Sequence, residues 1–218
     1  MKNLNMKPFI YMLAVLSALV LYITALIKEV DPTNFLDLIG IIPIIVTVDF
    51  IAYLTFTTWL WRFEFLQGWL IPFPDLNGTW EGQIHSSYKD EDNKKSGPLP
   101  VILTIRQKFG RLSCVMRTKE MTSHSYLEGF IINKEEQVQQ LCYSYASRPK
   151  AELRDKSTPH DGTALFNIIG KPVEKLIGEY WTLRNTRGTF TLKFREKKIL
   201  EEFPISLVKS ISGQDSAD

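Results

Sequence analysis

The sequence predicts two N-terminal transmembrane α-helices followed by an all-β domain, an antiparallel β-barrel of about eight strands. Two observations predict this fold. Two long apolar runs occupy the first 61 residues, and each is long enough to cross a membrane as a helix. Beyond residue 78, short runs rich in β-branched and aromatic residues alternate with turn residues, without a convincing amphipathic helix.

The first apolar run covers residues 9–27 without a charged residue, and the second covers residues 38–61 with one, Asp49. A hydrocarbon layer about 30 Å thick requires roughly 20 apolar residues in a helix, because each residue rises about 1.5 Å. We therefore expect both runs to span a membrane. A cleaved signal peptide is the alternative interpretation of the first run, although the run exceeds the roughly 7–15 residues of a signal-peptide core.

Basic residues flank the two spans on one side. Lys2 and Lys7 precede the first span and Arg62 follows the second, whereas acidic residues outnumber lysine in the connecting loop. Because lysine and arginine near a span are retained in the cytoplasm, both termini are predicted to be cytoplasmic. The loop is short and carries Asp31-Pro32-Thr33-Asn34 as turn residues, which predicts an antiparallel helical hairpin within residues 1–66.

Asp49 lies near the centre of the second span. A carboxyl group at that depth costs about 2.5–3.5 kcal/mol on insertion scales, so it should face a partner helix or a hydrated path, or be protonated. We predict a role for Asp49 in transmembrane assembly. The alternative is a neutral carboxyl group that the hairpin tolerates.

The segment after the second span is first aromatic and then rich in proline. Residues 67–77 form a predicted linker that Pro72 and Pro74 stiffen, because proline fixes φ. The barrel is expected over residues 78–204, and the polar tail 205–218 is expected to be disordered. An aromatic belt at the cytoplasmic membrane interface is expected from Trp59, Trp61, Phe63, Phe65 and Trp69.

Eight runs with strand character follow the linker. Tight-turn signals at residues 109–111 and 185–188 and long polar loops at residues 88–98 and 147–159 separate some of them. Hairpin-connected strands in this number can close into a barrel, which removes exposed strand edges. The runs are residues 79–87, 101–108, 112–118, 123–132, 138–146, 162–169, 175–183 and 189–195.

The first strand opens with Gly78-Thr79-Trp80, which resembles the Gly-x-Trp opening of lipocalin-like barrels. A lipocalin-like barrel of about eight strands has room for its own side chains or for one small ligand. Trp80 is expected to plug the closed end, with a basic residue such as Arg195 over its ring.

Charge and residue spacing bear on several classes of function. The residues after position 61 carry 23 basic and 20 acidic groups, an excess too small to predict binding of a DNA or RNA polymer. Cys114 and Cys142 lack paired metal-ligand spacing and are predicted to be reduced core residues. His85, His124 and His160 are far apart in sequence, so neither a metal site nor an enzyme is predicted, although strand pairing could bring some of them together.

Aromatic, hydroxyl and arginine side chains recur on the predicted strands. Tyr143 and Tyr145 share one face of a strand, and Arg184 ends another. Tyrosines stack on bases, arginines bind phosphate with bidentate geometry, and hydroxyls complete the polar contacts. The alternative is a packed aromatic core with solvated arginines at its rim. The candidate ligand-binding residues are Ser125, Tyr143, Tyr145, Arg148, Tyr180, Thr182 and Arg184.

Four motifs follow the apolar runs in order. They are Gly78-Thr79-Trp80-Glu81-Gly82, Tyr143-Ser144-Tyr145 with Pro149, His160-Asp161-Gly162-Thr163, and the stretch from Gly178 to Gly188. Behind two membrane spans, this order resembles the two-transmembrane β-barrel effectors of bacterial cyclic-oligonucleotide-based antiphage signalling (CBASS), the CD-NTase-associated proteins. The resemblance covers the chain from the first span to about Arg195.

The resemblance implies a function. In that family a nucleotidyltransferase, the CD-NTase, makes a cyclic dinucleotide on infection, and the cytosolic barrel binds it. Binding drives self-association, and the transmembrane segments then disrupt the lipid bilayer of the bacterial inner membrane and kill the infected cell. A cyclic dinucleotide ligand is therefore expected, with no cofactor and no catalytic residue. The alternative is a membrane-tethered, lipocalin-like carrier of a fatty acid or other small apolar ligand, which predicts a mainly apolar pocket.

Overall fold

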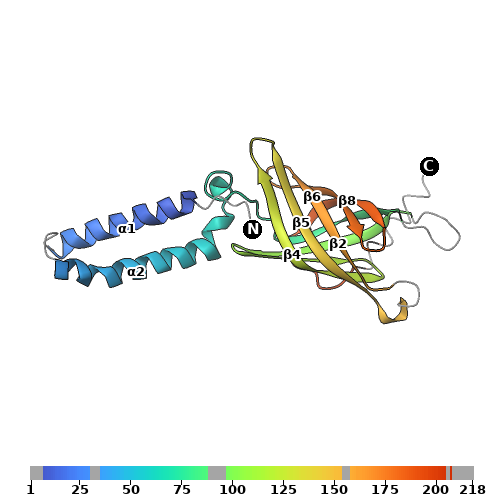
Figure 1. Ribbon diagram of the computed structural model, residues 1–218, viewed down its shortest axis with the longest axis horizontal. Coiled ribbons are helices and arrows are strands. Elements are labelled where there is room, and N and C mark those ends of the chain that lie inside the picture. The colour runs from blue at the N-terminus through green and yellow to red at the C-terminus, as the bar shows by residue number, and fades with distance from the viewer. Residues whose placement is uncertain (1–6, 30–34, 88–96, 154–157, 205–206, 208–218) are drawn as a thin grey trace. The chain divides into compact units, whose positions relative to one another are not determined.

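The computed structural model describes residues 7–29, 35–87, 97–153, 158–204 and 207 (Figure 1). The chain divides into two compact units, one of residues 4–74 with the three residues 108–110, the other of residues 75–107 and 111 onward. The expected turn at Asp31–Asn34 lies outside the described residues, as does nearly all of the expected disordered tail 205–218. Each unit is described by itself.

The first unit contains two antiparallel helices, α1 (Lys7–Ile27) and α2 (Phe35–Thr58). The Phe9 ring lies 4.6 Å from the Phe56 ring, between the start of α1 and the end of α2. By length and composition both helices could cross a membrane, with mean hydropathies of 2.5 and 2.1 over residues 7–27 and 39–58. The prediction of two apolar N-terminal helices is confirmed.

Asp49 of α2 faces α1. Its Oδ2 atom accepts a hydrogen bond of 2.6 Å from the Ser17 hydroxyl, while Oδ1 is buried without a hydrogen-bond partner among the described residues. The carboxyl group therefore faces a partner helix within the hairpin, one of the environments expected for it. Its role in assembly stays a prediction.

The second helix ends three residues before the predicted boundary, and two short 3-10 turns follow it, η1 (Leu60–Arg62) and η2 (Glu64–Leu66). These turns bury Trp61 completely, with its ring 5.8 Å from that of Phe73. Trp59 and Trp69 remain largely exposed. The expected inclusion of Trp61 in an exposed aromatic belt is therefore wrong, because the chain turns here instead of continuing as a straight helix.

The second unit is a closed antiparallel barrel in which each strand pairs with the next and β8 pairs with β1. The predicted fold class is confirmed, and the largest boundary difference is at the end of β5, which reaches Pro149 instead of Ala146. A short 3-10 helix, η3 (Ala151–Leu153), follows β5. The strands are β1 (Gly78–Ser86), β2 (Leu99–Lys108), β3 (Arg111–Arg117), β4 (Met121–Asn133), β5 (Val138–Pro149), β6 (His160–Ile169), β7 (Lys175–Thr182) and β8 (Arg187–Glu196).

Apolar side chains fill the end of the barrel at which β1 begins. Trp80 is buried there, donates its indole N–H to the Leu76 carbonyl oxygen at 3.0 Å, and meets the Phe194 ring edge-on at 5.2 Å. The expected plug is thus present. The expected cation–π partner is wrong: Arg195 pairs with Glu81 and Glu196, because neighbouring strand residues point to opposite faces. Other buried side chains of the core are Leu103, Ile105, Leu141, Phe166, Leu176 and Leu192.

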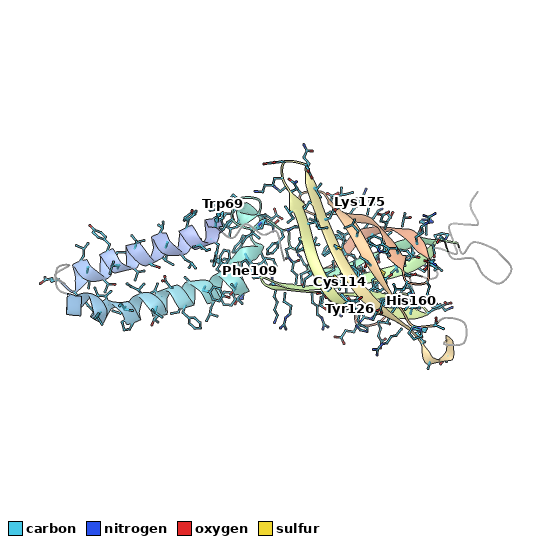
Figure 2. The ribbon with its side chains drawn as sticks, viewed as in Figure 1. Trp69, Phe109, Cys114, Tyr126, His160 and Lys175 are labelled. Atoms are coloured by element: carbon cyan, nitrogen blue, oxygen red, sulfur yellow. The ribbon has the colours of Figure 1, made fainter. Side chains whose placement is uncertain are left out.

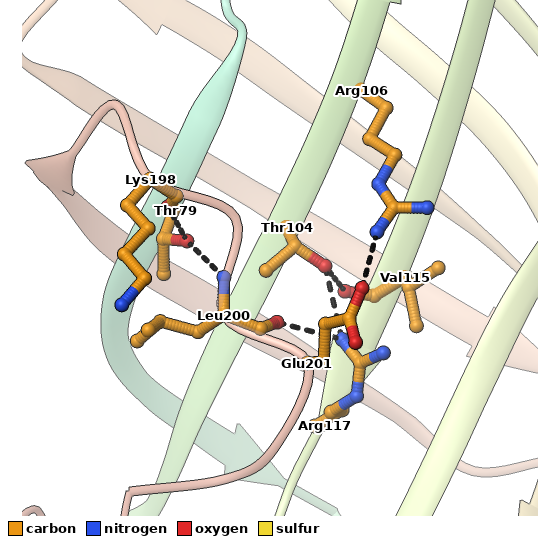
Figure 3. A network of polar contacts seen from close by, with 8 residues as sticks. All are labelled: Thr79, Thr104, Arg106, Val115, Arg117, Lys198, Leu200 and Glu201. Atoms are coloured by element: carbon orange, nitrogen blue, oxygen red, sulfur yellow. Dashed lines mark hydrogen bonds and ion pairs between the residues drawn. The ribbon is translucent and has the colours of Figure 1, made fainter.

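Residues 197–201, which we call the strap, run across the outer face of β1–β3 (Figure 3). The Thr79 hydroxyl donates to the Lys198 carbonyl oxygen at 2.6 Å and accepts from the Leu200 N–H at 3.1 Å. Arg117 donates to the Leu200 carbonyl oxygen at 3.3 Å and to the Thr104 hydroxyl at 3.0 Å. Because the strap covers them, Thr79 and Thr104 are buried although they face outward.

We expect Thr79→Val to lower the free energy of unfolding of the barrel by about 1–3 kcal/mol, because the strap loses two hydrogen bonds and two backbone groups lose their partner. Chemical unfolding of the full chain in detergent, followed by tryptophan fluorescence, measures this. Thr191→Val on β8 is the control, since Thr191 is exposed. Equal effects of the two substitutions on the free energy of unfolding would contradict the expected contribution of the strap to stability.

Candidate ligand-binding site at the polar end of the barrel

Inward-facing side chains form three rows at the opposite end of the barrel, where β5 ends and β6 begins. Directly opposed residues of antiparallel strands share a face, so the strand register defines the rows. The rim row is Ser123, Ser147 and His160, and the middle row is Ser125, Tyr145, Gly162 and Thr182. The inner row is Glu128, Tyr143, Ala164, Tyr180, Gly188 and Ser86.

Two glycines make room for two tyrosine rings. A Cβ atom at Gly162 would lie 2.6 Å from the tip of the Tyr145 ring, and one at Gly188 would lie 2.6 Å from the Tyr180 ring. Any larger residue would displace the ring, because real Cβ contacts are not this short. The tyrosines therefore lie flat across neighbouring strands instead of projecting along the barrel axis.

An aromatic arc runs along the wall below the rim. Ring centroids are 5.9 Å apart for Tyr145 and Tyr143, 6.0 Å for Tyr143 and Phe166, and 5.0 Å for Phe166 and Phe190. Tyr180 continues the arc at 5.0 Å from Phe190. Tyr143, Tyr145, Phe166 and Phe190 are buried against one another, and Tyr180 is partly exposed. Aromatic rings of this kind can stack on planar groups such as nucleobases.

Hydroxyl groups lie above and beside the aromatic arc. The Ser123 hydroxyl donates to that of Ser147 at 2.9 Å, and the Tyr180 hydroxyl donates to that of Ser86 at 2.9 Å. Thr182 and Thr186 place their hydroxyl oxygens 2.7 Å apart. Neutral hydroxyls both donate and accept, so they can bond to phosphate oxygens and to ribose hydroxyls.

Arg184 supplies positive charge beyond the middle row, in the turn between β7 and β8. Its guanidinium donates to the Thr158 hydroxyl at 3.4 Å, and His160 Nδ1 lies 3.2 Å from the Thr158 carbonyl oxygen. Burial raises the pKa of Tyr145 and of Tyr180, and the charge of Arg184 opposes the rise in both, so the guanidinium acts on both rings. His160 and Lys175, which begin β6 and β7, mark opposite ends of the barrel (Figure 2).

His160 makes folding stability depend on pH. Burial lowers its pKa from the usual 6.5, and Arg184 adds to the shift, whereas the Thr158 hydrogen bond and Asp161 oppose it. Because the unfolded chain binds the proton first as pH falls, the free energy of unfolding should fall as pH decreases through 6.5 toward the lower folded-state pKa. Thermal unfolding of wild type and His160→Asn between about pH 5 and pH 7 measures the difference.

The variant should show a shallower dependence of stability on pH over that window, with the two proteins differing least in slope above it. His124→Asn is the control, because His124 is exposed on β4. Parallel curves for wild type and His160→Asn would contradict the prediction.

The structure brings six of the seven sequence-predicted residues to the same end of the barrel. Ser125, Tyr145 and Thr182 lie in the middle row, Tyr143 and Tyr180 lie in the inner row, and Arg184 lies in the adjoining turn. Arg148 does not join them. It is exposed and alternates with the buried, inward-facing Ser147, so its side chain belongs to the outer face.

The sequence reasoning missed several residues of the rows. Ser147 could have been found, since the alternation that pairs Tyr143 with Tyr145 continues to it. Glu128 could not, because the register of β4 shifts between Ser125 and Leu127 and changes the phase of the alternation. The other missed residues are Ser86, Ser123, His160 and Thr186.

An open depression of about 450 Å³ adjoins the inner row where β7, β8 and β1 meet. Its lining includes Tyr180, Ser86 and Gly188 of the inner row together with Arg187 and Glu179. The described residues contain no group of three potential metal ligands, and Cys114 and Cys142 are free thiols. The site therefore consists of aromatic, hydroxyl and charged side chains.

These features define a class: a small β-barrel with a polar, aromatic end, preceded by two helices that could span a membrane. Residues 71–194 match the family model described as Cap15, cyclic dinucleotide receptor domain. The chain belongs to this family, and the resemblance to CD-NTase-associated CBASS effectors is confirmed. CD-NTase-associated protein 15 from Staphylococcus schleiferi is 28% identical over 155 residues, which cover 71% of this chain and 79% of that protein.

Proposed function

We propose that this chain is a membrane-anchored effector of antiphage defence whose barrel binds a cyclic dinucleotide made by a cognate CD-NTase. Membership of the Cap15 receptor-domain family supports the ligand class. The observation that carries the proposal is the combination of an aromatic arc, paired hydroxyls and Arg184 at one end of the barrel. The chain acts in this proposal as a receptor and not as an enzyme.

Each part of a cyclic dinucleotide has a partner of suitable chemistry at the polar end. Bases stack on the tyrosines of the arc, and a phosphate accepts charge-assisted hydrogen bonds from Arg184. The hydroxyls of Thr182, Thr186 and Ser147 bond to the sugar and to the remaining phosphate oxygens.

The helices are the output part of the proposed effector, in the inner membrane with both termini cytoplasmic. They expose many large apolar side chains, among them Val15 and Phe50 at 70% and 58%, as lipid-facing helices do. Ligand binding drives self-association because the assembled state binds the ligand more tightly than the monomer does. Clustered hairpins then disrupt the bilayer.

The competing carrier function requires a mainly apolar pocket. The described residues oppose it: buried side chains such as Phe166 and Leu192 fill the inner half of the barrel, and hydroxyls and tyrosines occupy the other end. A fatty acid would find neither a long apolar channel nor a match for the hydroxyl pairs.

Titrating the detergent-solubilised full chain with cyclic di-AMP, cyclic di-GMP, cyclic GMP–AMP and cyclic di-UMP tests the proposal. Calorimetry measures binding, light scattering measures assembly, and dye release from liposomes measures membrane disruption. We expect at least one ligand to bind and to trigger both assembly and release. A chain that binds none of the panel but binds oleate would reverse the choice between receptor and carrier.

A further inference from the structure

A bulge in β4 turns two polar side chains toward the same space. Ser125 and Glu128 are three residues apart, a spacing that places side chains on opposite faces of a regular strand. The register, however, pairs Ser125 with Tyr145, Leu127 with Ser144 and Glu128 with Tyr143. The extra residue restores the phase, so Ser125 and Glu128 both face inward, beside the two tyrosines.

Ser125 holds the Glu128 carboxylate from one side. The Ser125 hydroxyl donates to Glu128 Oε1 and accepts from the Cys114 backbone N–H at 2.8 Å, so its hydrogen-bonding roles are used within the barrel wall. Burial raises the pKa of the Cys114 thiol, and the negative charge of Glu128 raises it further, which places that charge near the interior. Among the described residues, Glu128 Oε2 has no hydrogen-bond partner.

Glu128 is partly exposed, whereas Tyr143, opposite it in the same row, carries a buried unsatisfied group. The Tyr143 side chain is 2% exposed, and its hydroxyl is buried without a hydrogen-bond partner among the described residues. Native proteins seldom leave a buried hydroxyl unpaired, because it loses its hydration without compensation. Two polar atoms on facing strands of one row, Glu128 Oε2 and the Tyr143 hydroxyl, therefore lack a hydrogen-bond partner among the described residues.

The charge of Glu128 restricts what that ligand can place here. A carboxylate repels phosphate but accepts hydrogen bonds from the exocyclic amino groups of adenine, guanine and cytosine. Uracil and hypoxanthine carry no amino group and offer such a carboxylate only one ring N–H on that edge. We propose that Glu128, with Tyr143, is the base-selecting group of the site and favours cyclic dinucleotides with an amino-bearing base; the inference rests on the proposed ligand class.

In this arrangement the amino N–H donates to Glu128 Oε2, and the Tyr143 hydroxyl donates to an acceptor on the same base edge. A site built to pair a polar group discriminates strongly against an analogue that lacks it, because its own buried groups are then left unpaired. Arg184 remains the phosphate-binding group at the rim. The site would thus recognise the phosphate charge at the rim, through Arg184, and the base deeper in the barrel, through Glu128 and Tyr143.

Cyclic di-IMP is the test probe, because hypoxanthine lacks the 2-amino group of guanine and replaces the 6-amino group of adenine by a carbonyl. Calorimetry on the full chain in detergent compares it with cyclic di-AMP and cyclic di-GMP. Wild type should bind the better amino-bearing ligand roughly 10- to 100-fold more tightly than cyclic di-IMP. Glu128→Gln should reduce that ratio to about threefold or less, since a neutral amide replaces the charged acceptor.

Glu136→Gln is the matched control, because Glu136 is exposed in the turn between β4 and β5, at the other end of the barrel, and it should leave the ratio unchanged. Tyr143→Phe removes only the unpaired hydroxyl, so it should fold normally and bind amino-bearing ligands several-fold more weakly. It provides a readout even where Glu128→Gln does not fold.

Equal affinity of wild type for amino-bearing ligands and cyclic di-IMP would overturn the inference, as would an unchanged ratio in folded Glu128→Gln. If Tyr143→Phe binds amino-bearing ligands as tightly as wild type, Tyr143 is not part of the base-selecting group. Wild type that binds no cyclic dinucleotide would overturn the proposed function instead, so the two failures are distinguishable.

Discussion

Arg184→Ala is expected to weaken cyclic dinucleotide binding by roughly 10- to 100-fold, whereas Arg148→Ala should change it by about twofold or less. A charge-assisted hydrogen bond contributes about 1.5–3 kcal/mol, which corresponds to the larger change. Arg184 lies beside the middle row and acts electrostatically on Tyr145 and Tyr180. Arg148 lies on the outer face. Calorimetry on the full chain with the tightest ligand of the panel measures both variants.

Both substitutions replace an arginine by alanine and lower the net charge by one. The Arg148→Ala variant therefore controls for the loss of charge in Arg184→Ala. Arg184→Lys separates bidentate from simple charge recognition, because lysine keeps the charge without the planar fork. An Arg148→Ala variant that binds as weakly as Arg184→Ala would show that ligand binding involves the outer face. It would then contradict the site described above.

Asp49→Leu is expected to lower the rate of ligand-triggered dye release from liposomes tenfold or more, while ligand binding to the barrel persists. The substitution removes the acceptor that the Ser17 hydroxyl uses at 2.6 Å and the buried, unpaired Oδ1 atom. It also removes the insertion cost of a carboxyl group, about 2.5–3.5 kcal/mol, so the variant should insert at least as well. Asp49→Asn keeps an acceptor for Ser17 and should retain part of the activity.

Thr47→Val is the control for a polar group in the same helix, because the Thr47 hydroxyl bonds to the Pro43 carbonyl oxygen at 2.7 Å within α2. It should release dye at the wild-type rate. Comparable release by Asp49→Leu and wild type, at equal amounts of inserted protein, would mean that the spans act as apolar anchors or wedges. The carboxyl group would then be incidental.

The strand pattern was predictable because each strand carries its own signal. Alternation between a buried and an exposed face requires only that one face meets a core, and tight turns such as Phe109-Gly110-Arg111 need particular residues. All eight strands lie where their runs predicted them, and the apolar spans are α-helices. The short 3-10 turns after Thr58 were not predictable, because three residues are too few to show a helical period in the sequence. The packing of these turns buries Trp61.

The site was predictable only in part. The two-residue spacing of Tyr143 and Tyr145 by itself predicts that both side chains lie on one face of the strand, and the strand register confirms it. Arg148 was misplaced relative to them, because an odd spacing from Tyr145 sends it outward. Glu128 was missed because a bulge is a property of two paired strands, and a single run of residues does not reveal it.

By itself, the sequence determined the two membrane-length helices, the eight-stranded barrel behind them and the residue types suited to an anionic, planar ligand. These depend on local properties: run length, alternation and turn chemistry. Only the tertiary structure decided which side chains share the polar end, because strand register and the β4 bulge bring together residues from β1, β4, β5, β6 and β7 that are far apart in the chain. Placing Glu128 inside and Arg148 outside is the clearest result of that long-range pairing.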